Sequence, residues 1–220
     1  MTKHFQNEIE RLKKHILYMA AMVEKSLVSS VQSFNDRDLE LADEVIDSDP
    51  KIDSQEVEVE EECLKILALH QPVAADLRYV VAVLKINNDL ERIADLAVNI
   101  AKRTKNIITN GTVKMPIDLN QMVDLAIQMV RESVDSLVQN DIAKASQVIL
   151  NDDEIDNYHK QNYKIGQEHI KANPEATEYY ISLLSVSRNL ERIADHATNI
   201  AEDVIYMIEG EIVRHKGSFI

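Results

Sequence analysis

The chain has few of the residues that break helices, build tight loops or form disulfides. Its 220 residues include only four glycines, four prolines and one cysteine, Cys63. A single cysteine excludes an internal disulfide and is typical of a reducing compartment. The strand-type alternation of apolar and polar residues is also absent, whereas Ala, Leu, Ile, Glu, Lys and Asp dominate. Together these features predict an all-α protein.

The sequence also lacks the features of membrane, secreted and nucleic-acid-binding proteins. No run reaches the roughly eighteen apolar residues of a membrane-spanning helix, and the first residues contain no apolar signal segment. The formal net charge of −14 argues against nucleic acid as a partner, because phosphate backbones bind to basic surfaces. We therefore expect a cytoplasmic protein without direct membrane insertion.

Catalytic motifs are scarce as well. No glycine-rich phosphate loop occurs, and Ser133 and Ser187 lack the context of a catalytic triad. The Glu-x-x-His pattern of ferritin-like di-iron proteins is missing, and Asp156-x-x-His159 is the nearest match. His196, which replaces a leucine of the first half, is interpreted as an exposed helical histidine. The sequence predicts that the protein is not an enzyme.

What the sequence does contain is an internal repeat. Residues 90–95, LERIAD, recur letter for letter as residues 190–195, and several later residues recur at the same offset of one hundred. The repeated letters include Glu91, Asp95 and Asn99, whose four-residue spacing places them on one face of a helix. Core packing alone does not require that polar set twice. The chain is therefore predicted to contain two copies of one helical module, each with an acidic site.

Turn signals divide the chain into six long helical segments. In the first half we expect helices over residues 3–34, 50–69 and 73–108, with a short helix at 37–46 and an N-cap at 47–50. In the second half we expect helices over residues 118–139, 153–172 and 175–214, with a cap at 151–153. The offset between equivalent residues falls from 107 to 103 to 100, and each drop lies at a turn. This pattern predicts two tandem antiparallel three-helix bundles, residues 1–108 and 118–220, joined by a linker at 109–117.

Acidic residues form a candidate site in each module. On a helical wheel Glu91 and Asp95 lie on the flank and outer face of their helix, away from the apolar stripe. A second acidic pair with the same spacing precedes them, and antiparallel folding about the corners near residues 71 and 173 brings the pairs to similar heights. The handedness of the bundle decides whether they face one another, and the sequence does not give it. The candidate metal ligands are Asp49, Asp53, Glu91 and Asp95 in the first module and Asp152, Asp156, Glu191 and Asp195 in the second.

Carboxylates that lie at the same level along two adjacent helices repel one another. At ~4 Å and an effective dielectric near 20, each pair costs on the order of 4 kcal/mol. Arg92 and Arg192, protonation or a bound cation would relieve this repulsion. Sites with only oxygen ligands suit hard cations, or iron and manganese, sometimes in multinuclear clusters. The alternative interpretation is a solvated acidic face stabilised by pairs such as Arg92–Asp95.

The motifs resemble a known family. The corner HQPVAADLR at residues 70–78, followed by NDLERIAD at residues 88–95, is similar to the PhoU family of phosphate-transport regulatory proteins. The second copy and residues 210–215 resemble it too, so the resemblance covers essentially the whole chain. It implies two three-helix bundles in tandem, with divalent or trivalent metal ions, including multinuclear iron or zinc clusters, on the acidic motifs. One departure is Asn189 in place of Asp89, which removes a charge from the second site.

The resemblance also implies a function. PhoU proteins restrain phosphate uptake and keep phosphate-starvation signalling off when phosphate is plentiful. The implied partners are the ATPase subunit of a phosphate ABC transporter, a phosphate-sensing histidine kinase and a second copy of the chain in a homodimer. Arg78, at the first corner, is a candidate for the transporter-facing surface. Two other functions stay open: a carboxylate-bridged metal hydrolase or oxidase on a helical bundle, and a metal-free helical scaffold.

Overall fold

The computed structural model describes residues 3–109, 117 and 119–210. Within these residues the chain forms six long helices and one short 3₁₀ turn, and no strand occurs. The first bundle contains α1 (Lys3–Asp36), α2 (Leu39–His70) and α3 (Ala74–Thr109). The second contains α4 (Asn120–Gln139), α5 (Ile142–Ala172) and α6 (Thr177–Glu209), with the turn η1 (Pro174–Ala176) before α6. The all-α class and the two tandem three-helix bundles that the sequence predicts are confirmed.

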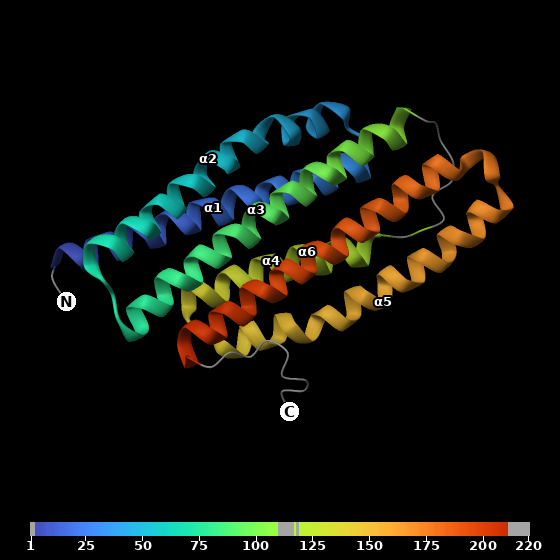
Figure 1. Ribbon diagram of the computed structural model, residues 1–220. Helices are drawn as coiled ribbons and strands as arrows, with labels where there is room; N and C mark the ends of the chain where they lie inside the picture. The colour runs from blue at the N-terminus through green and yellow to red at the C-terminus, as the bar shows by residue number, and fades with distance from the viewer. Residues whose placement is uncertain (1–2, 110–116, 118, 211–220) are drawn as a thin grey trace.

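The two bundles lie side by side and join along their last helices. Figure 1 shows α3 and α6 next to each other in the middle of the molecule, with α2 and α5 on the outer sides. The apolar stripes of all six helices point inward and form one continuous cluster that includes residues of both bundles. Leu90 and Leu190, the first residues of the two LERIAD copies, are both fully buried. The apolar letters of the repeat thus occupy equivalent places in the core.

The predicted break before residue 50 is wrong. Helix α2 begins after Asp38, whose carboxylate accepts a hydrogen bond of 3.0 Å from the backbone N–H of Leu41, and continues through Pro50. The cause is tertiary packing. Ala42 and Val45 lie on the turns before the proline and are buried against α3, and this burial offsets the roughly 3 kcal/mol that a proline costs inside a helix.

The predicted cap at residues 151–153 is wrong for a related reason. The N-cap of α5 is Asp141, whose carboxylate accepts a 3.0 Å hydrogen bond from the backbone N–H of Lys144. The helix then runs unbroken past residue 151, because Ala145 and Val148 are buried in the core. Helix α6 ends at Glu209, with Gly210 in the left-handed conformation after it. Residues 211–214, predicted to continue this helix, and most of the predicted linker lie outside the described residues.

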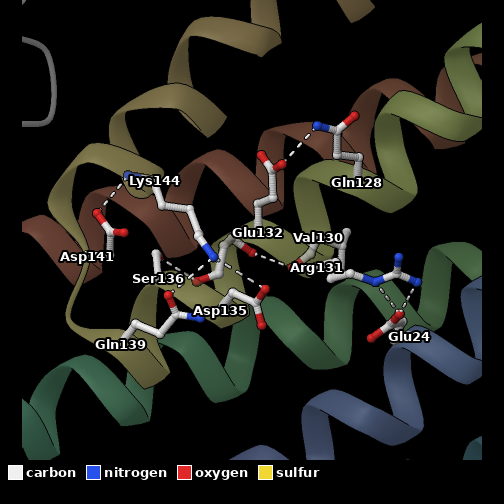
Figure 2. A network of polar contacts seen from close by, with 11 residues as sticks. Glu24, Gln128, Val130, Arg131, Glu132, Asp135, Ser136, Gln139, Asp141 and Lys144 are labelled. Atoms are coloured by element: carbon white, nitrogen blue, oxygen red, sulfur yellow. Dashed lines mark hydrogen bonds and ion pairs between the residues drawn. The ribbon is translucent and has the colours of Figure 1, made fainter.

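Polar contacts also tie the two bundles together. Figure 2 shows Arg131 of α4 reaching Glu24 of α1, where its Nε and Nη2 atoms donate to Oε1 at 2.8 and 2.6 Å. Between α3 and α6, the Arg78 guanidinium donates to the carbonyl of Met207 at 3.2 Å. Arg78, predicted to face a transporter, therefore contacts the second bundle. No described helix has both the length and the apolar character that crossing a membrane requires.

Candidate functional site

Four carboxylates of the first module come together between α2 and α3. We call Asp49, Asp53, Glu91 and Asp95 the first acidic cluster. Burial raises the pKa of Asp49, and the charges of Asp53 and Asp95 raise it further. Burial and the charge of Asp95 likewise raise the pKa of Glu91, while Arg92 opposes the rise. The charge of Asp95 on α3 acts on Asp49, and the charges of Glu56 and Asp53 on α2 act on Glu91, so the two acidic pairs lie on neighbouring faces of the two helices.

The equivalent carboxylates of the second module form a second acidic cluster. Its members are Asp152, Asp156, Glu191 and Asp195 on α5 and α6. Burial, followed by the charges of Asp195 and Asp156, raises the pKa of Asp152 to about 6. Burial is also the main cause that raises the pKa of Glu191 and Asp195, and Asp156 adds to both rises. Asp152 is therefore the carboxyl of this cluster whose ionisation is opposed most, by burial first and by the neighbouring charges second.

Basic side chains neutralise each cluster only in part. In the first cluster Arg92 contacts Asp95 at 3.1 Å and Glu91 at 3.2 Å. In the second, Lys160 contacts Asp156 at 2.9 Å. The buried oxygen Oδ1 of Asp49 has no hydrogen-bond partner among the described residues. Carboxylate oxygens are the ligands that hard cations prefer. Among the described residues, however, no three carboxylates of either cluster have ligand atoms within 4.8 Å of one another.

Two further residues belong beside the clusters, one in each module. Glu56 of α2 and His159 of α5 hold equivalent positions, three residues after Asp53 and Asp156. Burial raises the pKa of Glu56, and the charges of Glu60 and Asp53 add to this effect. Burial, followed by the charge of Arg188, lowers the pKa of His159. The three-residue spacing from each second aspartate is the sequence signal for both residues, and the Asp156-x-x-His159 pattern shows it in the second module.

The histidine at position 196 is not the exposed side chain that the sequence predicts. Its Nδ1 atom lies 2.8 Å from Oδ1 of Asp89, across the α3–α6 junction, and both side chains are mostly buried. The amide of Asn199 donates to the same oxygen at 3.3 Å. His196, unlike its counterpart Leu96, lies beside a carboxylate of the other module. A helical wheel drawn for a single module does not reveal this contact.

A separate cluster, unpredicted from the sequence, joins the start of α1 to the end of α2. Glu8, only 6% exposed, lies 2.9 Å from Nε2 of His70 and 3.5 Å from Nε2 of His4. The ammonium of Lys65 also donates to Glu8 at 3.0 Å. Among the described residues, this is the one group of His, Cys, Asp and Glu whose ligand atoms all lie within 4.8 Å. Because Lys65 already neutralises Glu8, we interpret the group as a set of polar contacts that hold the start of α1 against the end of α2.

Comparisons with known proteins agree with the duplicated architecture. The PhoU domain model matches the chain twice, over residues 16–104 and 119–204. A phosphate-specific transport system accessory protein PhoU homolog from Aquifex aeolicus is 38% identical over 209 residues, which cover 95% of each chain. The crystal structure of PhoU from Pseudomonas aeruginosa has a TM-score of 0.92 at 33% identity, covering 94% of this chain and 100% of that one. The phosphate transport system regulatory protein PhoU from Streptococcus pneumoniae has a TM-score of 0.83 at 26% identity, covering 95% and 99%.

Proposed function

The chain belongs to the PhoU family, and we propose that it is a metal-binding accessory protein that regulates phosphate uptake and phosphate-starvation signalling. The family match over both modules supports the link to phosphate transport. The observation that carries the metal-binding part is the duplicated acidic cluster. Each copy holds four carboxylates on two facing helices, and burial and mutual repulsion raise the pKa of several of them.

In this proposal the eight carboxylates hold divalent or trivalent metal ions. Asp49, Asp53, Glu91 and Asp95 bind in the first module, and Asp152, Asp156, Glu191 and Asp195 bind in the second. A bound cation would neutralise charges that Arg92 and Lys160 compensate only in part. Iron or zinc, alone or in multinuclear clusters, fits these ligands, and the imidazole of His159 makes a nitrogen donor available beside the second cluster.

The protein acts by contact rather than by turnover. We propose that it binds the ATPase subunit of a phosphate ABC transporter and a phosphate-sensing histidine kinase in the cytoplasm, as a homodimer. Relatives named phosphate-specific transport system accessory protein PhoU homolog support a role in the control of phosphate transport. Such a regulator would restrain uptake when phosphate is plentiful.

A serine–histidine contact beside the second cluster does not favour the hydrolase alternative. Nδ1 of His159 lies 3.0 Å from Oγ of Ser187. Ser187, however, is fully buried, and its hydroxyl also contacts the amide of Asn162 at 3.2 Å and the sulfur of Met122 at 3.5 Å. A substrate cannot reach a nucleophile enclosed in this way. We therefore interpret the contact as part of the core of the second module.

Metal analysis tests the proposed sites directly. The full chain is purified without chelator, and its metal content is measured by mass spectrometry. Glu91→Gln with Asp95→Asn should empty the first cluster and leave the second occupied, and Glu191→Gln with Asp195→Asn should do the reverse. Glu168→Gln, at an exposed position of α5, is the control and should change nothing. Unchanged metal content in both double variants would refute the ligand assignment, and a metal-free wild type would favour the plain scaffold.

The adaptor role is tested by capture. Immobilised protein is incubated with the transporter ATPase subunit and with the sensor kinase, and a phosphatase assay is run on the same preparation. We expect both partners to bind and no phosphate to be released. Metal-dependent turnover with neither partner captured would favour the carboxylate-bridged hydrolase instead.

A further inference from the structure

A basic pocket lies at one end of the α3–α6 junction. Its volume is about 500 Å³, and Asn99, Lys102, Arg103 and Asn106 of α3 and Ser185, Arg188 and Asn189 of α6 line it. No carboxylate is among these lining residues, although the chain carries a net charge of −14. Within the described part of the chain, none of the three cations forms an ion pair. The pocket thus gathers three positive charges that no ion pair among the described residues neutralises.

The internal repeat supplies a matched comparison, because the junction has an equivalent second end. There Lys85 of α3 pairs with Asp203 of α6 at 2.9 Å, and Asp89 contacts His196 at 2.8 Å. Lys85, Asp89 and Asp203 each lie one hundred residues from a counterpart that lines the pocket, whereas the counterpart of His196 is Leu96, which does not line it. Glu202 and Asp203 correspond to Lys102 and Arg103, while Lys85, Asn88 and Asp89 correspond to Ser185, Arg188 and Asn189.

Helix packing does not require this difference in charge. The same pair of helices, in the same crossing, holds internally paired acids and bases at one end. At the pocket end, the positions equivalent to Glu202, Asp203 and Asp89 hold a lysine, an arginine and an asparagine. The position equivalent to Lys85 holds a serine. Three cations around one pocket repel one another unless an anion joins them. The pocket is therefore built for a ligand that carries negative charge.

The lining residues match a phosphate group in both charge and donor geometry. A guanidinium presents a planar fork of N–H donors that binds two phosphate oxygens at once, and Arg103 and Arg188 supply two such forks from opposite helices. Lys102 adds a third charge, and the asparagine amides and the Ser185 hydroxyl add neutral donors. With three positive charges, the pocket suits a dianion better than a monoanion such as acetate.

We propose that this pocket binds a phosphate group, presented by inorganic phosphate or by a small phosphate ester, between the two modules. This site goes beyond the proposed function, because it needs neither a bound metal nor a partner protein. Lys102 lies close enough to Asp49, and Arg188 close enough to Glu191, to oppose the charge of those acids. Occupancy of the pocket would therefore reach both acidic clusters through these two side chains.

The test is a calorimetric titration of the full chain at constant ionic strength, with a chelator present so that the acidic clusters hold no metal. Inorganic phosphate and glycerol phosphate are the two probes, and sulfate and acetate are the comparison anions. The pocket variant combines Lys102→Gln, Arg103→Gln and Arg188→Gln. The control variant combines Lys14→Gln, Lys164→Gln and Lys171→Gln, which remove the same charge from exposed positions outside the pocket. Circular dichroism checks that both variants keep their helices.

We expect phosphate to bind the wild type and the control variant, and to bind the pocket variant at least tenfold more weakly. The order of the two probes identifies free phosphate or an ester as the better ligand. Equal weakening in both variants would overturn the site, because net charge alone would then explain binding. Absence of phosphate binding would overturn it as well. A parallel titration without chelator separates the two proposals. If phosphate binds only there, and binds the pocket variant as tightly as the wild type, the acidic clusters hold it through their metal, and the proposed function survives while this inference fails.

Discussion

Replacing Asp152 by asparagine should stabilise the metal-free protein at neutral pH. Burial, and then the charges of Asp195 and Asp156, raise the pKa of Asp152 from 3.8 to about 6. A carboxyl whose pKa is higher in the folded chain binds more protons when folded, so its contribution to stability falls as the pH rises through this range. Above pH 6 the wild type carries the full cost of the ionised group. Asparagine, of nearly the same shape, does not ionise.

The size of the effect follows from the two pKa values. The difference between 3.8 and about 6 corresponds to about 3 kcal/mol, at 1.36 kcal/mol for each pH unit. Asp152 is only partly buried, so water screens its neighbours and reduces the cost. We therefore expect Asp152→Asn to gain about 1–2 kcal/mol of unfolding free energy at pH 8. At pH 4 the wild-type carboxyl is protonated in the folded chain, and the two proteins should be nearly equal.

Urea unfolding, followed by circular dichroism in the presence of a chelator, measures this difference. Wild type and Asp152→Asn are compared at pH 8 and pH 4, with Glu168→Gln on the same helix as the control for loss of an exposed acid. A saturating metal ion should reverse the order at pH 8, because the wild type then binds the ligand that stabilises its folded state. An asparagine variant that is less stable than the wild type at pH 8 without metal would refute the repulsive cluster.

Three other substitutions test the packing and the charges around the bundles. Glu8→Gln should cost about 1–3 kcal/mol at pH 7 in urea unfolding, and this cost should shrink as the pH falls through the pKa of Glu8, which hydrogen bonds from Lys65 and His70 lower against the opposing effect of burial. Gly166→Ala should lower the unfolding free energy by about 1–2 kcal/mol, since its Cβ would lie 2.8 Å from the Leu184 side chain, and shortening Leu184 to valine should recover part of the loss. Glu24→Gln should cost less than about 1 kcal/mol, and 1 M salt should remove most of that difference.

Helix boundaries are predictable where apolar periodicity and turn chemistry agree. The third helix, expected over residues 73–108, spans Ala74–Thr109, and the corner before it falls where Gln71 and Pro72 indicate. The prediction fails where a local breaker opposes burial. Pro50 looks like a helix start, but Val45 before it and Ile52 after it are both buried, so the helix continues. Such a balance depends on the neighbouring helix, which local sequence does not show.

The sequence predicts which residues form the acidic clusters, but it does not predict whether the acidic sides of neighbouring helices face each other. Spacing alone places Glu91 and Asp95 on one side of α3 and Asp49 and Asp53 on one side of α2. Whether those sides meet depends on the handedness of the bundle, which arises from how all three helices pack. The contacts between the two modules could not be predicted from the sequence for a similar reason. They join residues about one hundred positions apart, such as Asp89 and His196, and no periodicity within one module marks them.

The two modules use one backbone arrangement for two different sets of polar residues. Glu56 adds a fifth carboxylate beside the first acidic cluster, whereas its counterpart His159 places an imidazole beside the second. Since equivalent helices hold both residues, the fold requires neither of them. A cation in the first cluster would meet oxygen ligands alone, which suit hard ions, while one in the second would have a nitrogen donor beside it, which suits zinc or iron. Duplication thus separates these polar residues from core packing. If the proposed metal sites exist, the two clusters would be able to prefer different ions without any change in the helices that carry them.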